Sequence, residues 1–479
     1  MVTGPAAPAI VIGGAGSGTG KTTLATGIMA ALSRRMEVAP FKVGPDYIDP
    51  GYHGLAVGRP GRNLDSVMCG PSLIAPLYAH GSAGCAIGVV EGVMGLYDGR
   101  IGGDPLSAAG STAEIARLLG APVVLVVDAR HMSQSVAALV HGFATLDDGV
   151  RVAGAIVNHV GSERHAAVCR DAVEAVGVPV LGEVPRVDGI AVPSRHLGLV
   201  TAAEHGGAGA IVEAMADLVE RHVDLGALVS LAVRPCDAEP WDPAAAVGAA
   251  DAAGAADAGR AGATDAPASG APRPRIAVAS GAAFTFAYAE HAEMLTAGGA
   301  DVVSFDPLTD DLPDCDGLVV PGGFPEEHAE ALSARDDLAA AVRRAVADGV
   351  AVHAECAGLL WLLEELDGRP MCGVVPGAGA MSGRPTLGYR EAVALRDSAL
   401  APAGLRVTGH EFHRTRLDPA RLGAAREAGW TPAWGWRDWR GKPAEEGLAS
   451  PDGRVHASYL HLHPAGAPGA VRRFLAAAR

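Results

Sequence analysis

The sequence is poor in aromatic residues, in lysine and in paired cysteines. Only 4% of its 479 residues are Phe, Trp or Tyr, and its lysines are Lys21, Lys42 and Lys442. The seven cysteines form no Cys-x-x-Cys pair, which argues against a disulfide framework and against a zinc site. Unpaired thiols fit a reducing compartment, so we expect a cytoplasmic protein.

Long hydrophobic runs and net positive charge are also missing. No segment approaches the roughly 18 consecutive apolar residues of a membrane span, and the N-terminus lacks a basic region followed by a hydrophobic core. The formal net charge of −16 argues against nucleic acid as the main partner. We therefore expect small-molecule substrates, with neither a membrane nor a nucleic acid as partner.

The length and the strand pattern indicate two domains. Short β-rich runs alternate with helical stretches in both halves, which predicts an α/β fold with two doubly wound, mostly parallel sheets. Residues 236–274 are rich in Ala, Gly, Asp and Pro and have few large apolar side chains, so we predict a flexible linker there. The predicted domains are residues 1–235 and 275–479.

A glycine-rich segment, residues 13–23, follows the apolar strand 9–12 and opens a helical pattern. It has the spacing of a phosphate-binding loop, with Ala15 where the strict motif has glycine. Backbone N–H groups would converge on phosphate oxygens, Lys21 would reach the β- and γ-phosphates, and the Thr22 hydroxyl would ligate Mg²⁺. The predicted nucleotide-binding residues are Gly18, Gly20, Lys21, Thr22 and Thr23.

Carboxylates follow the next two predicted strands of the first half. Asp46 and Asp49 come after strand 38–43, and Glu91 and Asp98 come after strand 85–90. Because ligands bind at the carboxyl edge of open α/β sheets, we predict that Thr22, Asp46 and Glu91 surround one Mg²⁺. Taken alone, the three aspartates could equally be turn or cap residues.

Each of three other polar residues of the first half has two possible interpretations. Lys42 is either a solvated strand end or a second cation beside the transferred phosphoryl group. Asn158, at the end of strand 154–157, would contact an adenine edge or close a turn. Arg195 could meet an acidic substrate, although solvent exposure is the more common state of a single arginine.

A cysteine stands at the turn between a strand and a helix in the second half. Residues 350–361 predict this strand, turn and helix, with Cys356 at the apex as in a nucleophile elbow. The helix N-terminus would favour the thiolate, whereas a buried structural cysteine is the alternative. Gly322 and Gly323 follow another strand, and their N–H groups are candidates for an oxyanion hole.

The C-terminal segment 455–464 alternates like a strand and would carry His456, His461 and His463 on one face. One of them could be the base that activates the thiol. A metal site is the alternative, but no cluster of acidic residues or cysteines accompanies the histidines. No acidic residue lies within two positions after His463, so no orienting carboxylate can be read from this segment.

Taken together, these motifs resemble the cobyrinic acid a,c-diamide synthase family, including its hydrogenobyrinic acid counterpart, over nearly the whole chain apart from the linker. The matching segments are residues 17–22, 42–50, 91–99, 195–199, 321–326, 354–356, 387–390, 409–413 and 458–463. Ala357 departs from the family's usual glycine after the cysteine.

The resemblance implies a dethiobiotin-synthetase-like ATP domain joined to a class I glutamine-amidotransferase-like domain. It makes His461 the base that pairs with Cys356, and His463 the alternative. It implies a ligase that uses ATP, Mg²⁺ and L-glutamine to amidate the a- and c-acetate groups of a corrinoid acid in cobalamin biosynthesis. Asp46, Asp49 and Asp98 would then position the ring carboxylate or the incoming nitrogen.

Three other functions compete with this one. They are a partition-type ATPase switch, a dethiobiotin-type ligase with an inert appendage, and a diamide synthase for another tetrapyrrole such as nickel sirohydrochlorin. The early loop position where a partition-type ATPase would carry a second lysine is glycine or alanine here, which disfavours the switch. The sequence leaves open whether the corrinoid contains cobalt and how many subunits assemble, a homodimer included.

Overall fold

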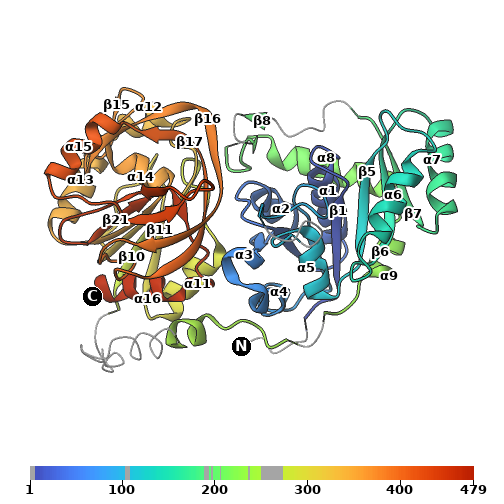
Figure 1. Cartoon of the computed structure of the whole chain (residues 1–479), viewed down its shortest axis with the longest axis horizontal. Helices are drawn as coiled ribbons and strands as arrows, with labels where there is room; N and C mark the ends of the chain where they lie inside the picture. Colours follow the sequence, from blue (N-terminus) through green and yellow to red (C-terminus); the bar gives the residue numbers. More distant parts are fainter. Residues whose placement is uncertain are drawn as a thin grey trace. The chain divides into compact units, whose positions relative to one another are not determined.

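The computed structural model describes residues 6–102, 108–187, 194–195, 198–204, 206–235, 238–249 and 273–479. The chain divides into two compact units, Met1–Trp241 and Asp242–Arg479 (Figure 1). Most of the predicted linker lies outside the described residues. Trp241, within that segment, is buried in the first unit, where its N–H donates to the carbonyl of Pro76 at 2.9 Å and its ring meets the edge of His80.

The first unit contains one seven-stranded sheet in the order β3-β2-β4-β1-β5-β6-β7, and every pair of neighbours is parallel. Its strands are β1 (Ala9–Gly14), β2 (Val38–Val43), β3 (Arg62–Leu64), β4 (Ile87–Glu91), β5 (Val123–Asp128), β6 (Val152–Val160) and β7 (Val180–Pro185). All six residues of β1 are buried, as expected for a parallel sheet covered on both faces. The predicted doubly wound sheet is confirmed.

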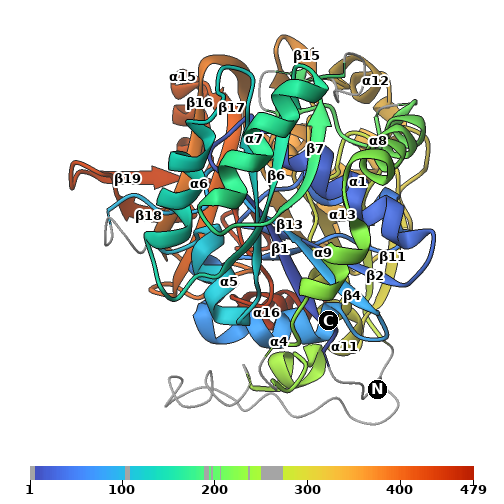
Figure 2. The same ribbon diagram turned by 90° about the vertical axis from the view of Figure 1, so that its right-hand side faces the viewer.

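Helices cover both faces of this sheet. They are α1 (Lys21–Ser33), α2 (Asp49–Val57), α3 (Ser66–Cys69), α4 (Ile74–Gly81), α5 (Thr112–Leu119), α6 (Val136–Thr145), α7 (Glu163–Ala175), α8 (Ala208–His222) and α9 (Leu225–Leu231). α6 and α7 lie side by side next to β6 (Figures 1 and 2). α1 packs closely on α8, because a Cβ atom on Gly27 would lie only 2.6 Å from the carbonyl oxygen of Met215.

The second unit also contains a mostly parallel sheet, in the order β11-β10-β12-β13-β21-β20. Its strands are β10 (Arg275–Ala279), β11 (Asp301–Phe305), β12 (Gly317–Val320), β13 (Ala351–Glu355), β20 (Leu448–Ala449) and β21 (Val455–Ser458). The helices that follow β10 are α11 (Ala289–Ala297), α12 (Ala329–Ser333), α13 (Asp336–Ala347), α14 (Ala357–Leu362), α15 (Pro419–Glu427) and α16 (Pro468–Ala477). This part confirms the second predicted α/β domain.

A further sheet of the second unit was not predicted. It runs β15-β14-β16-β17-β22, with β18 and β19 added beside β16. Its strands are β14 (Leu363–Leu366), β15 (Arg369–Pro370), β16 (Val375–Ala394), β17 (Arg406–Leu417), β18 (Trp434–Arg437), β19 (Pro443–Glu446) and β22 (Leu460–His461). The long antiparallel pair of β16 and β17 dominates it, and β18 and β19 form a hairpin that projects from the unit (Figure 2).

The prediction of one strand near the C-terminus with three histidines on one face is wrong. Alternation alone would place His456 on the face opposite His461 and His463, which are five and seven positions later. β21 ends at Ser458 and pairs with β13 in the parallel sheet, whereas β22 begins at Leu460 and pairs with β17 in the other sheet. The chain therefore changes sheets at Tyr459, and the alternation of side chains is interrupted. His456 bonds the Ser398 hydroxyl at 2.9 Å, whereas the ring of His463 lies 4.3 Å from that of Tyr288.

Among the described residues, no helix has the length and apolar character that crossing a membrane requires.

The contact of α1 with α8 can be tested by two glycine-to-alanine substitutions. Gly27→Ala should destabilise the first unit by about 1–3 kcal/mol, because the new methyl group meets backbone that cannot rotate away. Gly142→Ala is the matched control: a Cβ atom on Gly142, in α6, would have no atom within 4 Å, so alanine should stabilise by about 0.5–1 kcal/mol. Urea unfolding of both variants checks the opposite signs, and equal effects would contradict the close packing.

Candidate active sites in the two units

The loop between β1 and α1 has the shape that phosphate binding requires. Gly18 and Gly20 have φ angles of 76° and 90°, which glycine adopts without strain. Lys21 folds back so that its Nζ donates to the carbonyl oxygen of Gly16 at 2.8 Å. Because the positive φ angles fall on Gly18 and Gly20, Ala15 is compatible with the turn.

Asn158 fastens this loop to the end of β6. Its Nδ2 donates to the carbonyl oxygen of Thr19 at 2.9 Å, and its Oδ1 accepts from the N–H of His159 at 2.9 Å. The side chain lies so close to Gly20 that a Cβ atom there would collide with it. A contact of Asn158 with adenine stays a prediction, and the structure adds a role in holding the loop.

Lys42 is buried, so the hypothesis that it is a solvated strand end is wrong. Its Nζ lies 2.6 Å from Oδ2 of Asp49 and 2.8 Å from Oε1 of Glu91. Burial alone would lower the pKa of Lys42, but these two carboxylates outweigh it and raise the pKa above its ordinary value. Burial likewise opposes ionisation of Glu91, yet Lys42 and His53 bring its pKa well below the usual range. Lys42 and Glu91 are therefore a charged pair.

The oxygens around Lys42 are of the kind that Mg²⁺ prefers. Thr22 Oγ1 lies 2.7 Å from Oε1 of Glu91 and 3.3 Å from Oδ2 of Asp49. No three His, Cys, Asp or Glu side chains in the described part of the chain are arranged to hold a metal by themselves. Mg²⁺ is commonly bound by one or two carboxylates together with nucleotide phosphates, so these donors fit an ion that arrives with ATP.

Asp46 is placed differently from the predicted magnesium ligand. Its Oδ1 accepts from the N–H groups of Ile48 and Asp49 at 2.9 and 3.0 Å, which closes the turn that leads into α2. Its Oδ2 lies 4.0 Å from Lys42 Nζ. Asp49 therefore lies closer to Lys42 Nζ than Asp46 does, at 2.6 Å against 4.0 Å, and Asp49 also contacts Thr22.

The remaining predicted residues of the first unit lie on or near the same edge. Asp98 is exposed, accepts from the N–H of Gly95 at 2.8 Å, and acts electrostatically on Lys21. Burial, and then the charge of Lys42, lowers the pKa of Lys21 to about 8. Thr23 is half-buried on α1, and the Arg195 side chain lies outside the described residues.

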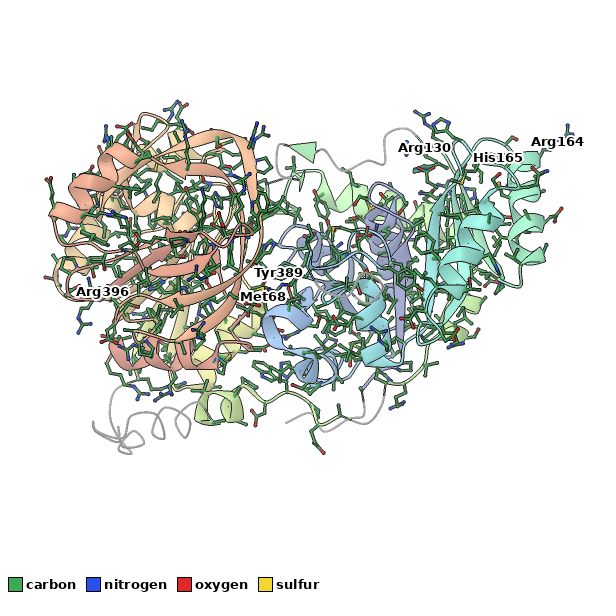
Figure 3. All side chains as sticks on the ribbon, in the orientation of Figure 1. Met68, Arg130, Arg164, His165, Tyr389 and Arg396 are labelled. Atoms are coloured by element: carbon green, nitrogen blue, oxygen red, sulfur yellow. The ribbon has the colours of Figure 1, made fainter. Side chains whose placement is uncertain are left out.

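An exposed basic side chain that was not predicted lies just after β5. Arg130 points away from the ribbon (Figure 3), and its Nε donates to Oδ2 of Asp128 at 2.8 Å. Asp128 also lies 3.3 Å from His159, which follows the loop-holding Asn158. The carboxyl edge of the sheet thus carries the exposed guanidinium of Arg130 in addition to the phosphate-binding loop.

In the second unit, Cys356 occupies the predicted elbow between β13 and α14. Its φ and ψ angles of 48° and −95° are unusual for a residue with a side chain. The conformation is held by a hydrogen bond from its N–H to the carbonyl of Ser458 at 2.7 Å. Strain of this kind at a strand-to-helix turn is typical of a nucleophile.

The expectation that the helix terminus favours a thiolate is wrong for this resting state. Burial, followed by the charge of Glu326, raises the pKa of Cys356 well above that of a free thiol, and the N–H of Ala357 opposes this only in part. The side chain is 3% exposed and α14 has six residues, so desolvation outweighs the helix dipole. The thiol therefore needs a base.

His461 and the two predicted oxyanion glycines lie near one another. A Cβ atom on Gly322 would collide with Cε1 of His461, and one on Gly323 would collide with the carbonyl oxygen of Ala283. In the antiparallel pairing of β22 with β17, His461 lies opposite His410. The Cys356 sulfur lies 3.8 Å from the carbonyl oxygen of Phe412, also on β17. The thiol, the imidazole and the glycines thus gather around β17 and the loop after β12.

The fold and these sites define a nucleotide-binding unit followed by a glutamine-amidotransferase unit. Residues 10–200 match the family model described as "CobQ/CobB/MinD/ParA nucleotide binding domain". Residues 275–468 match the one described as "CobB/CobQ-like glutamine amidotransferase domain". Both matches agree with the classes of domain that the sequence predicted.

Curated relatives cover both units at once. The chain is 52% identical to the hydrogenobyrinate a,c-diamide synthase of Mycobacterium tuberculosis, across 98% of this chain and 97% of the relative. It is 53% identical to the enzyme of that name from Streptomyces coelicolor, across 99% and 98%. The cobyrinate a,c-diamide synthase of Gloeobacter violaceus is 40% identical, across 98% and 96%. The chain belongs to the hydrogenobyrinate and cobyrinate a,c-diamide synthase family.

The close contact of Gly322 with His461 can be tested by Gly322→Ala. The methyl group should displace the imidazole and reduce glutamine-dependent turnover by about 10-fold or more, while turnover supported by added ammonia is retained. Gly469→Ala, in α16, is the control and should change neither activity, because a Cβ atom there would have no atom within 4 Å. Full glutamine-dependent activity of Gly322→Ala would contradict this placement.

Proposed function

We propose that the chain amidates the a- and c-carboxylates of hydrogenobyrinic acid, using ATP and the amide nitrogen of L-glutamine. The observation that carries this proposal is the 52–53% identity to two hydrogenobyrinate a,c-diamide synthases over nearly the full chain, against 40% to a cobyrinate a,c-diamide synthase. The higher identity supports the cobalt-free acid. The full-length match also supports a synthase over a partition-type ATPase.

The first unit activates the acid. A carboxylate offers no leaving group at neutral pH, so one of its oxygens attacks the γ-phosphorus of ATP, the bond to ADP breaks, and an acyl phosphate forms. Lys21 and the loop N–H groups hold the phosphate oxygens, and Lys42 stands near them. Mg²⁺, held by Thr22 with Glu91 and Asp49 or Asp46, would offset phosphate charge.

The second unit supplies nitrogen. His461 takes the proton of Cys356, whose sulfur attacks the side-chain carbonyl of glutamine, and the N–H groups of Gly322 and Gly323 hold the developing oxyanion. His461 returns the proton to the departing ammonia, and water hydrolyses the glutamyl thioester. Ammonia then attacks the acyl phosphate carbon and expels phosphate, with Asp46, Asp49 and Asp98 positioning the carboxylate or the nitrogen.

Bulk water would convert most of this ammonia to ammonium, which is not nucleophilic. We therefore expect the nitrogen to be used without release into solution. A cytoplasmic location and assembly as a homodimer also stay predictions.

The proposed reaction can be tested with purified protein, ATP, Mg²⁺, glutamine and either hydrogenobyrinic or cobyrinic acid. Mass spectrometry should show two amide conversions, with the cobalt-free acid used preferentially. Lys21→Ala should abolish synthesis, whereas Cys356→Ser should lose glutamine-supported but retain ammonia-supported synthesis. Lys442→Ala and Cys315→Ser are the matched controls. ATP turnover that ignores both acids would overturn the proposal.

The proposed role of Thr22 can be tested by Thr22→Val, which removes the hydroxyl and keeps the shape. The Mg²⁺ concentration for half-maximal ATP turnover should rise by about 10-fold, equivalent to roughly 1.4 kcal/mol of lost binding. A magnesium titration of ATP turnover measures this, and an unchanged midpoint would remove Thr22 from the metal site.

A further inference from the structure

A buried carboxylate lies beside His461, although no acidic residue follows the histidine in the sequence. Glu355 is the last residue of β13 and directly precedes Cys356. One of its oxygens lies 3.2 Å from Nε2 of His353 and accepts from the N–H of Leu462 at 3.3 Å. The other lies 3.7 Å from Nδ1 of His461. The carboxylate therefore lies between two imidazoles.

Glu355 is charged in spite of its burial. Burial alone would raise its pKa, but the adjacent imidazoles of His353 and His461 lower it below the usual range. A buried charge without partners is strongly destabilising, so this carboxylate depends on the imidazoles it contacts.

Further histidines stand behind this group and do not compete for the charge of Glu355. The rings of His291 and His456 lie 5.6 and 6.5 Å from that of His353, and His291 and His353 share a small cavity with Glu355. Burial, followed by the proximity of His353, lowers the pKa of His291 to about 4 and that of His456 to about 3. Both rings are therefore neutral at neutral pH.

The geometry assigns the orientation of the base. A carboxylate at Nδ1 favours the tautomer with hydrogen on Nδ1, which leaves Nε2, on the opposite side of the ring, as the proton acceptor. The imidazolium that forms when the thiol loses its proton would face a negative charge. Catalytic cysteines and serines commonly depend on a third group that orients their base in this way.

We propose that Glu355 is the positioning residue that orients His461 and stabilises its protonated form during glutamine hydrolysis. This inference rests on the proposed roles of Cys356 and His461. The distance of 3.7 Å is that of an ion pair and exceeds a hydrogen bond, and catalytic contacts of this kind commonly shorten only once substrate is bound. Glu355, which is distant in sequence, thus supplies the orienting carboxylate that the residues after His461 lack.

A purely structural role is the rival explanation, because Glu355 also accepts from the backbone of Leu462. The two roles differ in how the effect of Glu355→Gln on the labelling rate of Cys356 combines with the effect of replacing His461. A residue that acts through His461 has nothing left to do once His461 is replaced, whereas damage to the pocket adds to any other damage.

The test measures the rate at which a diazoketone analogue of glutamine labels Cys356 in the full chain, followed by intact mass. Glu355→Gln should slow labelling by about 10- to 100-fold, a part of what a general base contributes. In the His461→Asn background, adding Glu355→Gln should slow it by less than about 3-fold, because the two effects are not additive. Glu355→Asp, which keeps the charge, should be faster than Glu355→Gln.

The matched control is Glu446→Gln. Glu446 is another carboxyl near Cys356, but its oxygens accept from the hydroxyl of Ser458 and the N–H of Tyr459, each at 2.6 Å. Burial, followed by Glu411, raises the pKa of Glu446 to about 8, so glutamine closely mimics its protonated form. Labelling should stay within about 3-fold of the unmodified chain, and any decrease should multiply with that of His461→Asn.

Ammonia-supported synthesis should be retained by every variant and confirms that the chain is folded. Equal slowing by Glu355→Gln in both backgrounds, or no slowing in either, would overturn the inference. If Cys356→Ser retained glutamine-supported synthesis, or His461→Asn labelled at the normal rate, the proposed function would fail instead.

Discussion

The contact of Lys42 with Asp49 and Glu91 is the interaction on which the first site depends. It joins the end of β2, the start of α2 and the end of β4, and Thr22 bonds the same Glu91 from the start of α1. Removing one partner of a buried charge pair costs about 3–5 kcal/mol, because the other charge is left without compensation. The network therefore holds the phosphate loop and its neighbouring carboxylates in one arrangement.

The second unit builds its site from close backbone contacts and a strained turn. Gly322 and Gly323 allow the loop after β12 to pass directly beside His461 and Ala283, and Cys356 is held in its unusual conformation by the carbonyl of Ser458. In both units the chemistry lies at the carboxyl ends of parallel strands, where loops from neighbouring strands converge. In the first unit this edge carries the charged groups that suit phosphates, and in the second it carries a buried thiol and the imidazole of His461.

The parallel sheets could be predicted because buried strands are apolar throughout. The strand predicted at residues 38–43 has the bounds of β2, and the strand predicted at residues 9–12 lies within β1. β16 was missed because half-exposed glycine and arginine positions leave it without a regular alternation. The change of sheet at Tyr459 was missed although the alternation shifts by one position there. Apolar residues stand at odd positions up to Tyr459 and at even positions from Leu460.

The site was predictable where a residue type and its local spacing carry the chemistry, as with Lys21 and Cys356. The choice of His461 among the three histidines came from the family resemblance. The site was not predictable where the fold decides. Asp46 and Asp49 are three positions apart, and only the folded structure shows that Asp46 closes the turn before α2 while Asp49 pairs with Lys42. Glu355 and His461 are more than a hundred residues apart in sequence, so their contact required the tertiary structure.

We propose that the first unit activates the acid by transferring a phosphoryl group to it. The most direct measurement uses hydrogenobyrinic acid with ¹⁸O-labelled carboxylates and follows the inorganic phosphate released during synthesis. We expect each phosphate to carry one ¹⁸O atom, because the carboxylate oxygen that attacks ATP leaves with phosphorus. Phosphate free of ¹⁸O while both amides form would contradict the proposal.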